Sequence, residues 1–318
     1  AYNVAMGYQA GLSVSTGVRN VVIGGLAGDA LTTGGRNIAI GYSALSVEDT
    51  GSYNTAIGYN ALRDQDAGDA YNTAVGYNAG VSVTTGTHNT IVGGLAGDAL
   101  ENGARNVAIG YSALSTEDSG AKNVAVGWKA LELLNYNGDA YNVAMGYNAG
   151  ATMSTGLRNT IVGGLAGDAL TTAQYNTAVG YNALSAEDAH GHNTAVGADA
   201  LRTLNAGANA YNVAMGYDAG YAMSTGTENV LIGGLAGDSL TTGSFNVAIG
   251  HGALDQEDAH GKNVAIGYLT LTAQDAGVDA YNVAVGYNAG LNVSSGTANT
   301  LVGGSAGDAL TDGGVNTL

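Results

Sequence analysis

The side chains best suited to chemistry in this 318-residue chain are carboxylates that recur at regular intervals. A Glu is followed by an Asp at four places, which begin at Glu48, Glu117, Glu187 and Glu257. Two nearby carboxylates can hydrolyse a glycosidic bond. Four equivalent copies argue against this chemistry, because an active site needs a cleft and different environments for its two acids. We therefore interpret the pairs as a solvated acidic face and predict that the chain is not an enzyme.

A second candidate is a loop that carries Asp64, Asp66 and Asp69 within six residues. Closely spaced oxygen ligands of this kind surround a hard cation such as calcium. Later copies of the loop keep fewer carboxylates, and the copy around Asn205 has none, which favours an ordinary polar turn. Calcium at these three aspartates is thus the only cofactor hypothesis. His190 and His192 form a lone pair and the other three histidines lie in separate coils, so without recurring partners they predict no further metal site.

These acids recur because the whole chain is a repeat. Each repeat begins with an Asn that is followed by three mostly apolar residues and a Gly. Successive anchors are separated by 17, 18 or 19 residues. Such a short segment cannot bury an apolar core alone, but stacked copies can. The pattern predicts an all-β fold, a parallel β-solenoid or β-roll with coils of about seventeen residues.

The sequence also has a second, longer period that spans several coils. The extra residues always precede the anchors Asn72, Asn142, Asn212 and Asn282, so that four coils form one unit. We call these coils first to fourth, and the third carries the Glu-Asp pair. The sequence predicts a single repeat array over residues 1–318, with units that start near 3, 72, 142, 212 and 282. The chain opens within a repeat, which predicts that it is an excerpt or a processed product.

Each coil has one alternating segment that predicts a strand. The first and third residues after the anchor are mostly β-branched, as at Val107 and Ile109, and the second is usually Ala, as at Ala56 and Ala108. We expect the bulky pair to point into the coil and the Ala face to meet something close enough to need a small side chain. The Gly that follows predicts positive φ or a close backbone approach.

Every fourth coil replaces the middle Ala with a larger residue and has Gly at the fifth position, where positions are counted from the residue after the anchor Asn. These larger residues are Val22, Ile91, Ile161, Leu231 and Leu301. We interpret this exchange as compensation of volume on one crowded surface. It predicts an apolar ring or ridge at every fourth coil, where neighbouring chains or layers meet.

Two columns should stabilise the stack. Asn amides can form ladders between successive coils, and the anchors Asn37, Asn54, Asn106 and Asn176 exemplify that column. Tyr at the fifth position, as at Tyr42 and Tyr59, predicts stacked aromatic rings, with a platform for sugars as the alternative.

Composition excludes several classes of partner. The net charge of −17, with nine basic residues, does not fit nucleic-acid binding. No apolar run is long enough to predict membrane insertion. Six of the basic residues directly precede an anchor and could pair with the acidic column, although exposed pairs stabilise little. They are Arg19, Arg36, Arg105, Lys122, Arg158 and Lys262.

The stretch from Asn54 to Leu62, Asn-Thr-Ala-Ile-Gly-Tyr-Asn-Ala-Leu, resembles the shaft repeats of phage tail fibres and tail spikes. It is also similar to the head repeats of trimeric autotransporter adhesins of the YadA type. The resemblance covers the whole chain and implies a left-handed homotrimer in which the inner Ala faces the threefold axis. The coils here are longer than the usual repeat of those heads, and the bulky second coil is not part of their pattern.

We therefore expect a structural shaft segment of a trimeric fibre on a virion or in the extracellular space. Its partners would be copies of itself and a host receptor or glycan. The alternative is an adhesin or self-assembling filament that binds a ligand or neighbouring chains directly.

Overall fold

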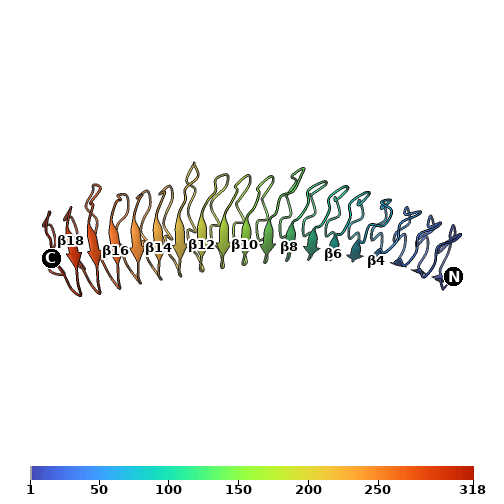
Figure 1. Ribbon diagram of the computed structural model, residues 1–318, viewed down its shortest axis with the longest axis horizontal. Coiled ribbons are helices and arrows are strands. Elements are labelled where there is room, and N and C mark those ends of the chain that lie inside the picture. Colours follow the sequence, from blue (N-terminus) through green and yellow to red (C-terminus); the bar gives the residue numbers. More distant parts are fainter. Residues whose placement is uncertain (1) are drawn as a thin grey trace. The chain divides into compact units, whose positions relative to one another are not determined.

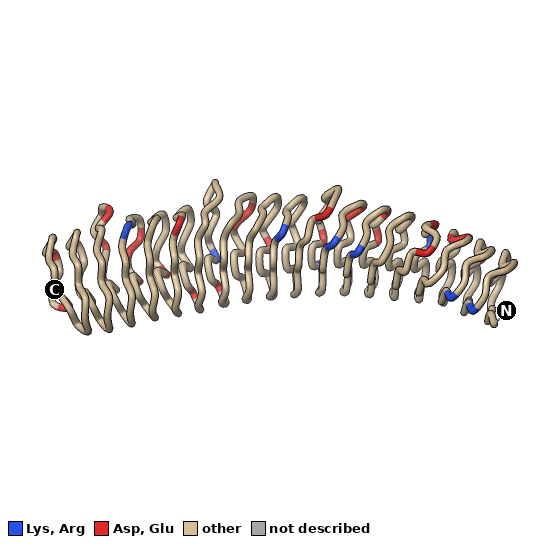
Figure 2. Tube along the Cα trace, in the orientation of Figure 1, with Lys and Arg blue, Asp and Glu red and all other residues tan. Residues whose placement is uncertain are grey.

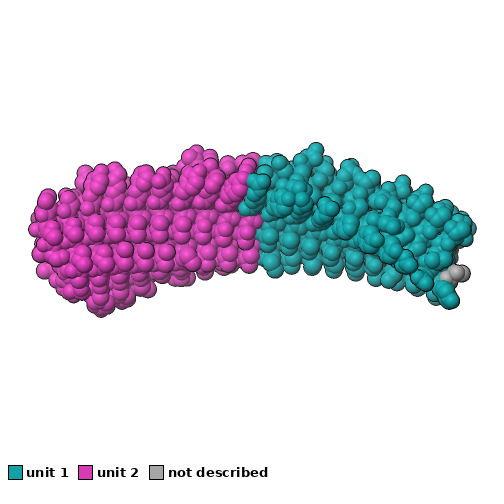
Figure 3. Space-filling model, in the orientation of Figure 1, with its two compact units in different colours: residues 1–158 teal, residues 159–318 magenta. Residues whose placement is uncertain are grey.

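A computed structural model describes residues 2–318, which form successive turns of chain with one short strand in nearly every turn (Figure 1). The chain divides into two compact units, Ala1–Arg158 and Asn159–Leu318 (Figure 3). The strands of the first unit are β1 Val4–Met6, β2 Val21–Ile23, β3 Ile38–Ile40, β4 Thr55–Ile57, β5 Thr73–Val75, β6 Thr90–Val92, β7 Val107–Ile109, β8 Val124–Val126 and β9 Val143–Met145. Those of the second unit are β10 Thr160–Val162, β11 Thr177–Val179, β12 Thr194–Val196, β13 Val213–Met215, β14 Val230–Ile232, β15 Val247–Ile249, β16 Val264–Ile266, β17 Val283–Val285 and β18 Thr300–Val302. The predicted all-β solenoid with coils of about seventeen residues is confirmed.

Within each unit, the strands pair in parallel with the strands of the coils before and after. In the first unit Val22 of β2 lies opposite Ala39 of β3, and in the second Ala178 of β11 lies opposite Ala195 of β12. The ladder continues beyond the strands, because Gly28 N donates to Ala44 O of the next coil at 2.9 Å. Residues 2–318 contain no helix, and so none with the length and apolarity that crossing a membrane requires.

The Gly that follows an internal strand is required for two reasons, as Gly41 shows. Gly41 has a φ of 136°, a conformation that side chains disfavour. A β-carbon on Gly41 would also lie 2.2 Å from the carbonyl oxygen of Gly58 in the next coil. The sequence predicted both possibilities, and both hold.

The two faces of the strand are the reverse of those expected. Ala108 is fully buried, whereas Val107 is half-buried and Ile109 is 36% exposed. The coil is so narrow that its wall admits only a methyl group at most middle positions, and the larger side chains must face outward. The prediction that Ala56 and Ala108 face a neighbouring chain is therefore wrong, because their own coils enclose them.

The larger middle residues also lie inside their own chain. All are at most 1% exposed, which leaves them no surface to offer to another chain: Val22, Ile91, Ile161, Leu231 and Leu301. The space for them comes from the Gly at the eighth position of the preceding first coil. A β-carbon on Gly80 would lie 2.9 Å from Cδ1 of Ile91 and 3.1 Å from Cδ2 of Leu62. Volume is thus compensated in the interior, not at an interface between chains.

The anchor asparagines form a buried, hydrogen-bonded column. The side-chain oxygen of Asn37 accepts from the backbone N of Asn54 at 2.9 Å, and its Nδ2 donates to Gly51 O at 2.7 Å. Oδ1 of Asn54, Asn106 and Asn176 likewise accepts from the next anchor, at 3.1, 2.9 and 3.0 Å. Asn37 and Asn106 therefore bond to their own coil and to the following one, whereas Nδ2 of the fourth-coil anchor Asn54 has no partner. The left-handed conformation falls on the residue before the anchor, such as Arg36 with a φ of 59°.

Candidate functional site

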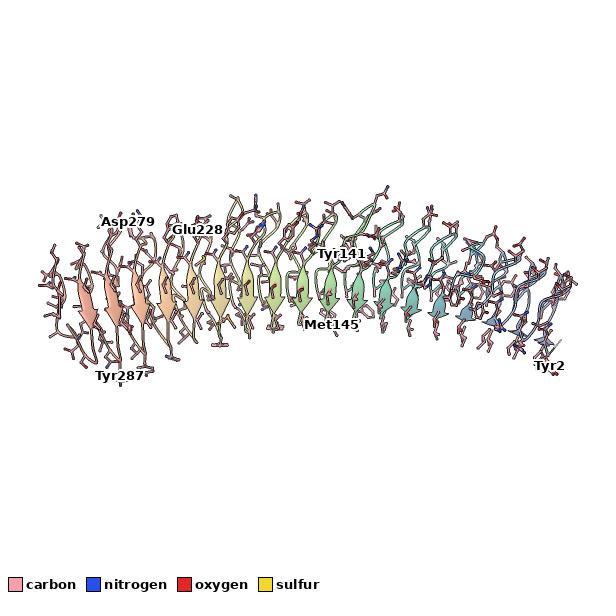
Figure 4. The ribbon with its side chains drawn as sticks, viewed as in Figure 1. Tyr2, Tyr141, Met145, Glu228, Asp279 and Tyr287 are labelled. Carbon is pink, nitrogen blue, oxygen red and sulfur yellow. The ribbon has the colours of Figure 1, made fainter. Side chains whose placement is uncertain are left out.

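The outer side of the strands is the first candidate surface. We call the first and third residues of every strand the strand face. These positions hold only Val, Ile, Thr and Met, although the chain has 35 charged residues. They are half-buried or exposed; Met145 and Met215 are each 43% exposed. Figure 4 shows Met145 at the carboxyl end of its strand. The strand face is thus an uncharged, largely apolar surface.

A row of rings lies beside the strand face at the carboxyl ends of the strands. We call these fifth-position residues the aromatic edge, and Figure 4 shows its member Tyr287. The rings of Tyr42 and Tyr59 stack with centroids 5.5 Å apart, as the sequence predicted, and Tyr59 stacks on Tyr77 at 5.5 Å. The row is interrupted in each second coil, where Gly94 leaves the ring of Tyr111 uncovered on one side. The aromatic edge is therefore divided into groups.

The amino ends of the strands carry the charged residues that precede the anchors. Lys122 contacts Asp139 at 2.5 Å, and Lys262 contacts Asp279 at 2.5 Å. Each Lys also donates to a tyrosine hydroxyl, Lys122 to Tyr141 at 2.9 Å. The Lys122 ammonium holds the pKa of the Asp139 carboxyl below its usual range. The partners of these two lysines are fourth-coil aspartates rather than the Glu-Asp pairs. Figure 2 shows the acidic and basic residues spread over many turns of the chain.

The Glu of each Glu-Asp pair is the most unexpected residue in the chain. Glu48, Glu117, Glu187 and Glu257 are all fully buried, so the prediction of a solvated acidic face is wrong for them. They stand at the eleventh position of the third coil. The same position holds Leu31 and Leu100 in second coils. A carboxyl group thus replaces an aliphatic side chain once in every four coils.

Hydrogen bonds to the backbone hold these carboxyl groups in place. Oε1 of Glu117 accepts from Gly120 N at 2.7 Å, and its Oε2 accepts from Tyr136 N at 3.3 Å, in the long loop of the fourth coil. Glu48 and Glu187 contact the equivalent backbone groups. Burial outweighs these bonds and raises the pKa of Glu117 to about 7. The pKa values of Glu48, Glu187 and Glu257 are also raised by burial.

The fourth-coil loop does not assemble the predicted calcium site. Asp64 forms an ion pair with Arg63 at 2.5 Å, and Oδ1 of Asp69 accepts from Ser52 N at 3.1 Å. Asp66 alone lies with other carboxylates, those of Glu48 and Asp49. The three aspartates therefore have separate surroundings.

A different grouping occurs where the third and fourth coils meet. We define the junction by four positions: the buried Glu, the Asp after it, the residue three beyond the Glu, and the twelfth residue of the fourth coil. At one junction these are Glu257, Asp258, His260 and Asp275, each with a ligand atom within 4.8 Å of the others. Glu187, Asp188 and His190 form a second group, and Glu48, Asp49 and Asp66 a third.

This arrangement was not predicted, because most of the histidines fall in separate coils without an obvious recurring partner. His190 and His260 in fact follow their glutamates by the same three residues. The common eleventh position of Glu257 and Leu240 was the signal that the Glu would face the interior. Neither a comparison with protein-family models nor one with curated proteins finds a match to this chain.

Proposed function

We propose that this chain is a shaft segment of a virion or other extracellular fibre, in which copies of the chain associate through the strand face. The observation that carries the proposal is the uncharged strand face on a chain of net charge −17. A surface that is repeatedly apolar on an acidic molecule is typical of a protein interface.

The repeat supports association between like chains. Each four-coil unit presents the same strand face and the same group of rings, so two copies can match along many coils at once. Many weak contacts in register give strong association, since each contact raises the effective concentration of the next. The exposed charged residues at the amino edge and on the loops would remain in solvent and keep the assembly soluble.

The resemblance to tail-fibre and adhesin-head repeats makes three the expected number of chains. The interface differs from the one that the resemblance implies, because the inner Ala residues are enclosed and the strand face takes their place. A shaft of this kind acts mechanically: its hydrogen-bonded coils hold a receptor-binding part away from a base. Direct binding of a glycan to the aromatic edge is the rival function.

Analytical ultracentrifugation tests the association. We expect the unaltered chain to sediment as a trimer, and the double variant Ile109→Lys, Ile249→Lys to sediment as a monomer, because each Lys places a charge in the strand face. Thr116→Lys is the matched control, because Thr116 is exposed on a loop and the same charge there leaves the trimer intact. A monomer for the unaltered chain would overturn the proposal. Glycan-array binding by a monomeric chain would instead favour the adhesin.

A further inference from the structure

We propose that the junction around Glu257 binds one divalent transition-metal ion, with Zn²⁺ as the best-fitting ion, through Glu257, Asp258, His260 and Asp275. The proposal is independent of the fibre function. It concerns a site between two coils of the second compact unit, Asn159–Leu318, away from the strand face.

The geometry of the four side chains suits such an ion. Their ligand atoms all lie within 4.8 Å of one another, and His260 Nδ1 is 3.6 Å from Glu257 Oε1. Ligands at the usual zinc distances of about 2.0 to 2.1 Å in a tetrahedron are separated by roughly 3.3 Å. The junction therefore needs only small side-chain adjustments to hold the ion.

Two orphaned atoms point to a missing ligand. Oε2 of the fully buried Glu257 has no hydrogen-bond partner, and neither has the buried Nδ1 of His260. Leaving such atoms unpaired costs about 1 to 3 kcal/mol each. At Glu117 and Glu187 the corresponding oxygen accepts from Tyr136 N and Ala206 N, both at 3.3 Å. A cation would satisfy the orphaned oxygen and nitrogen of the Glu257 junction together.

The other junctions form a graded series. The Glu187 junction keeps three of the groups but has Asn205 where Asp275 stands. These two positions are equivalent, because Asn205 N donates to Ser224 O at 2.7 Å and Asp275 N donates to Ser294 O at 2.9 Å. The Glu117 junction has Gly120 and Asn135 at the variable positions, and so lacks both the imidazole and the second loop carboxylate. The chain therefore contains its own weaker site and its own negative control.

The donor set selects among cations. One imidazole nitrogen with carboxylate oxygens suits zinc and related transition ions, whereas calcium takes six to eight oxygen ligands and does not favour imidazole. The Irving–Williams order places zinc above manganese at such a site. The expected order of affinity is therefore zinc, manganese, calcium.

Isothermal titration of the metal-free chain with Zn²⁺ tests the proposal. We expect one tight site per chain, followed by weaker binding at the Glu187 junction. His260→Ala should abolish the tight event, and Asp275→Asn, a change of an exposed residue, should weaken it by at least roughly tenfold. His251→Ala is the matched control, since it removes an exposed His outside the junctions and should leave the titration unchanged.

A gain of binding completes the test. Asn205→Asp should supply the fourth ligand at the Glu187 junction and produce a second tight site. Co²⁺ bound in place of Zn²⁺ should show the visible absorption of a low-coordinate ion, and His260→Ala should remove it. The proposal is overturned if the unaltered chain binds no Zn²⁺ tightly, or if the His260→Ala and His251→Ala variants titrate alike, which would indicate diffuse binding to surface carboxylates.

Discussion

The junctions around Glu117 and Glu257 share one backbone design but treat their buried carboxyl groups differently. At Glu117 both oxygens accept backbone hydrogen bonds, from Gly120 N and Tyr136 N. At Glu257 only Oε1 accepts one, from His260 N at 3.1 Å, and Oε2 has no partner. We call the Glu117 junction closed, because both of its carboxyl oxygens have backbone partners. We call the Glu257 junction open, because one carboxyl oxygen is unpaired beside an imidazole.

The difference shows that a solenoid can vary its chemistry one coil at a time. The Glu occupies the same eleventh position in both junctions, so the scaffold supplies burial and the turn that follows. Two substitutable positions, the residue three beyond the Glu and the twelfth residue of the fourth coil, decide whether the carboxyl group only stabilises a turn or is also available to a ligand.

The largest expected effect concerns pH at the closed junction. The pKa of Glu117 is raised to about 7 from 4.5, so the folded chain binds a proton that the unfolded chain releases in this interval. The stabilisation is complete below pH 4.5 and is lost as the pH rises to 7, a change of about 3 kcal/mol in the free energy of unfolding. Urea titrations between these pH values should show a smaller loss for Glu117→Gln than for the unaltered chain. Equal losses in both would show that Glu117 does not carry the pH dependence.

One substitution at each junction, compared in the absence of metal, should change the free energy of unfolding by different amounts. A β-carbon at Gly120 would lie 2.3 Å from the Glu117 carboxyl carbon, so Gly120→Ala must displace that buried group and should cost about 1 to 3 kcal/mol. His260→Ala removes only an imidazole 3.6 Å from Glu257, and should change stability by less than about 1 kcal/mol. Urea unfolding of both variants, with the metal chelated, measures the contrast. Similar losses at both positions would contradict the distinction between closed and open junctions.

The smallest expected effect on stability concerns Gln274, at the eleventh position of a fourth coil. Gln274 is fully buried, its Oε1 accepts from Asn282 Nδ2 at 2.7 Å, and its Nε2 has no partner. Leu134 and Leu204 stand at the same position in other units. Gln274→Leu should therefore be neutral or stabilise by up to about 1 kcal/mol, which thermal unfolding would detect. A marked loss of stability would mean that the bond to Asn282 matters more than the orphaned amide.

The sequence was sufficient to predict the repeat, the strands and the columns. The anchor Asn, the Gly at the fourth position and the alternation between them are local signals with direct structural causes. The orientation of the strand was not predictable in the same way, because the usual rule assigns large residues to the interior. In Val107-Ala108-Ile109 the narrow coil reverses that rule.

The junctions could be predicted only by comparing equivalent positions in different coils, and not from the residues of one coil alone. Read alone, Glu257-Asp258 is a polar loop. Aligned by anchors, Glu257 falls on the column of Leu240 and Val293, which indicates burial. Its proximity to Asp275 depends on the path of the long loop, and no local pattern in the sequence fixes that path.

The four-coil order of the interior also limits how such a chain can change its length. The buried Glu48, Glu117 and Glu187 accept hydrogen bonds from the backbone of a fourth-coil loop. The larger middle residues Ile91, Leu231 and Leu301 fill the space beside a first-coil Gly. Loss of a single coil would bring mismatched interiors together, whereas loss or duplication of four consecutive coils would restore every contact. A gene for this protein can therefore lengthen or shorten its product by recombination in whole modules, in steps of about 19 Å at the spacing of parallel strands.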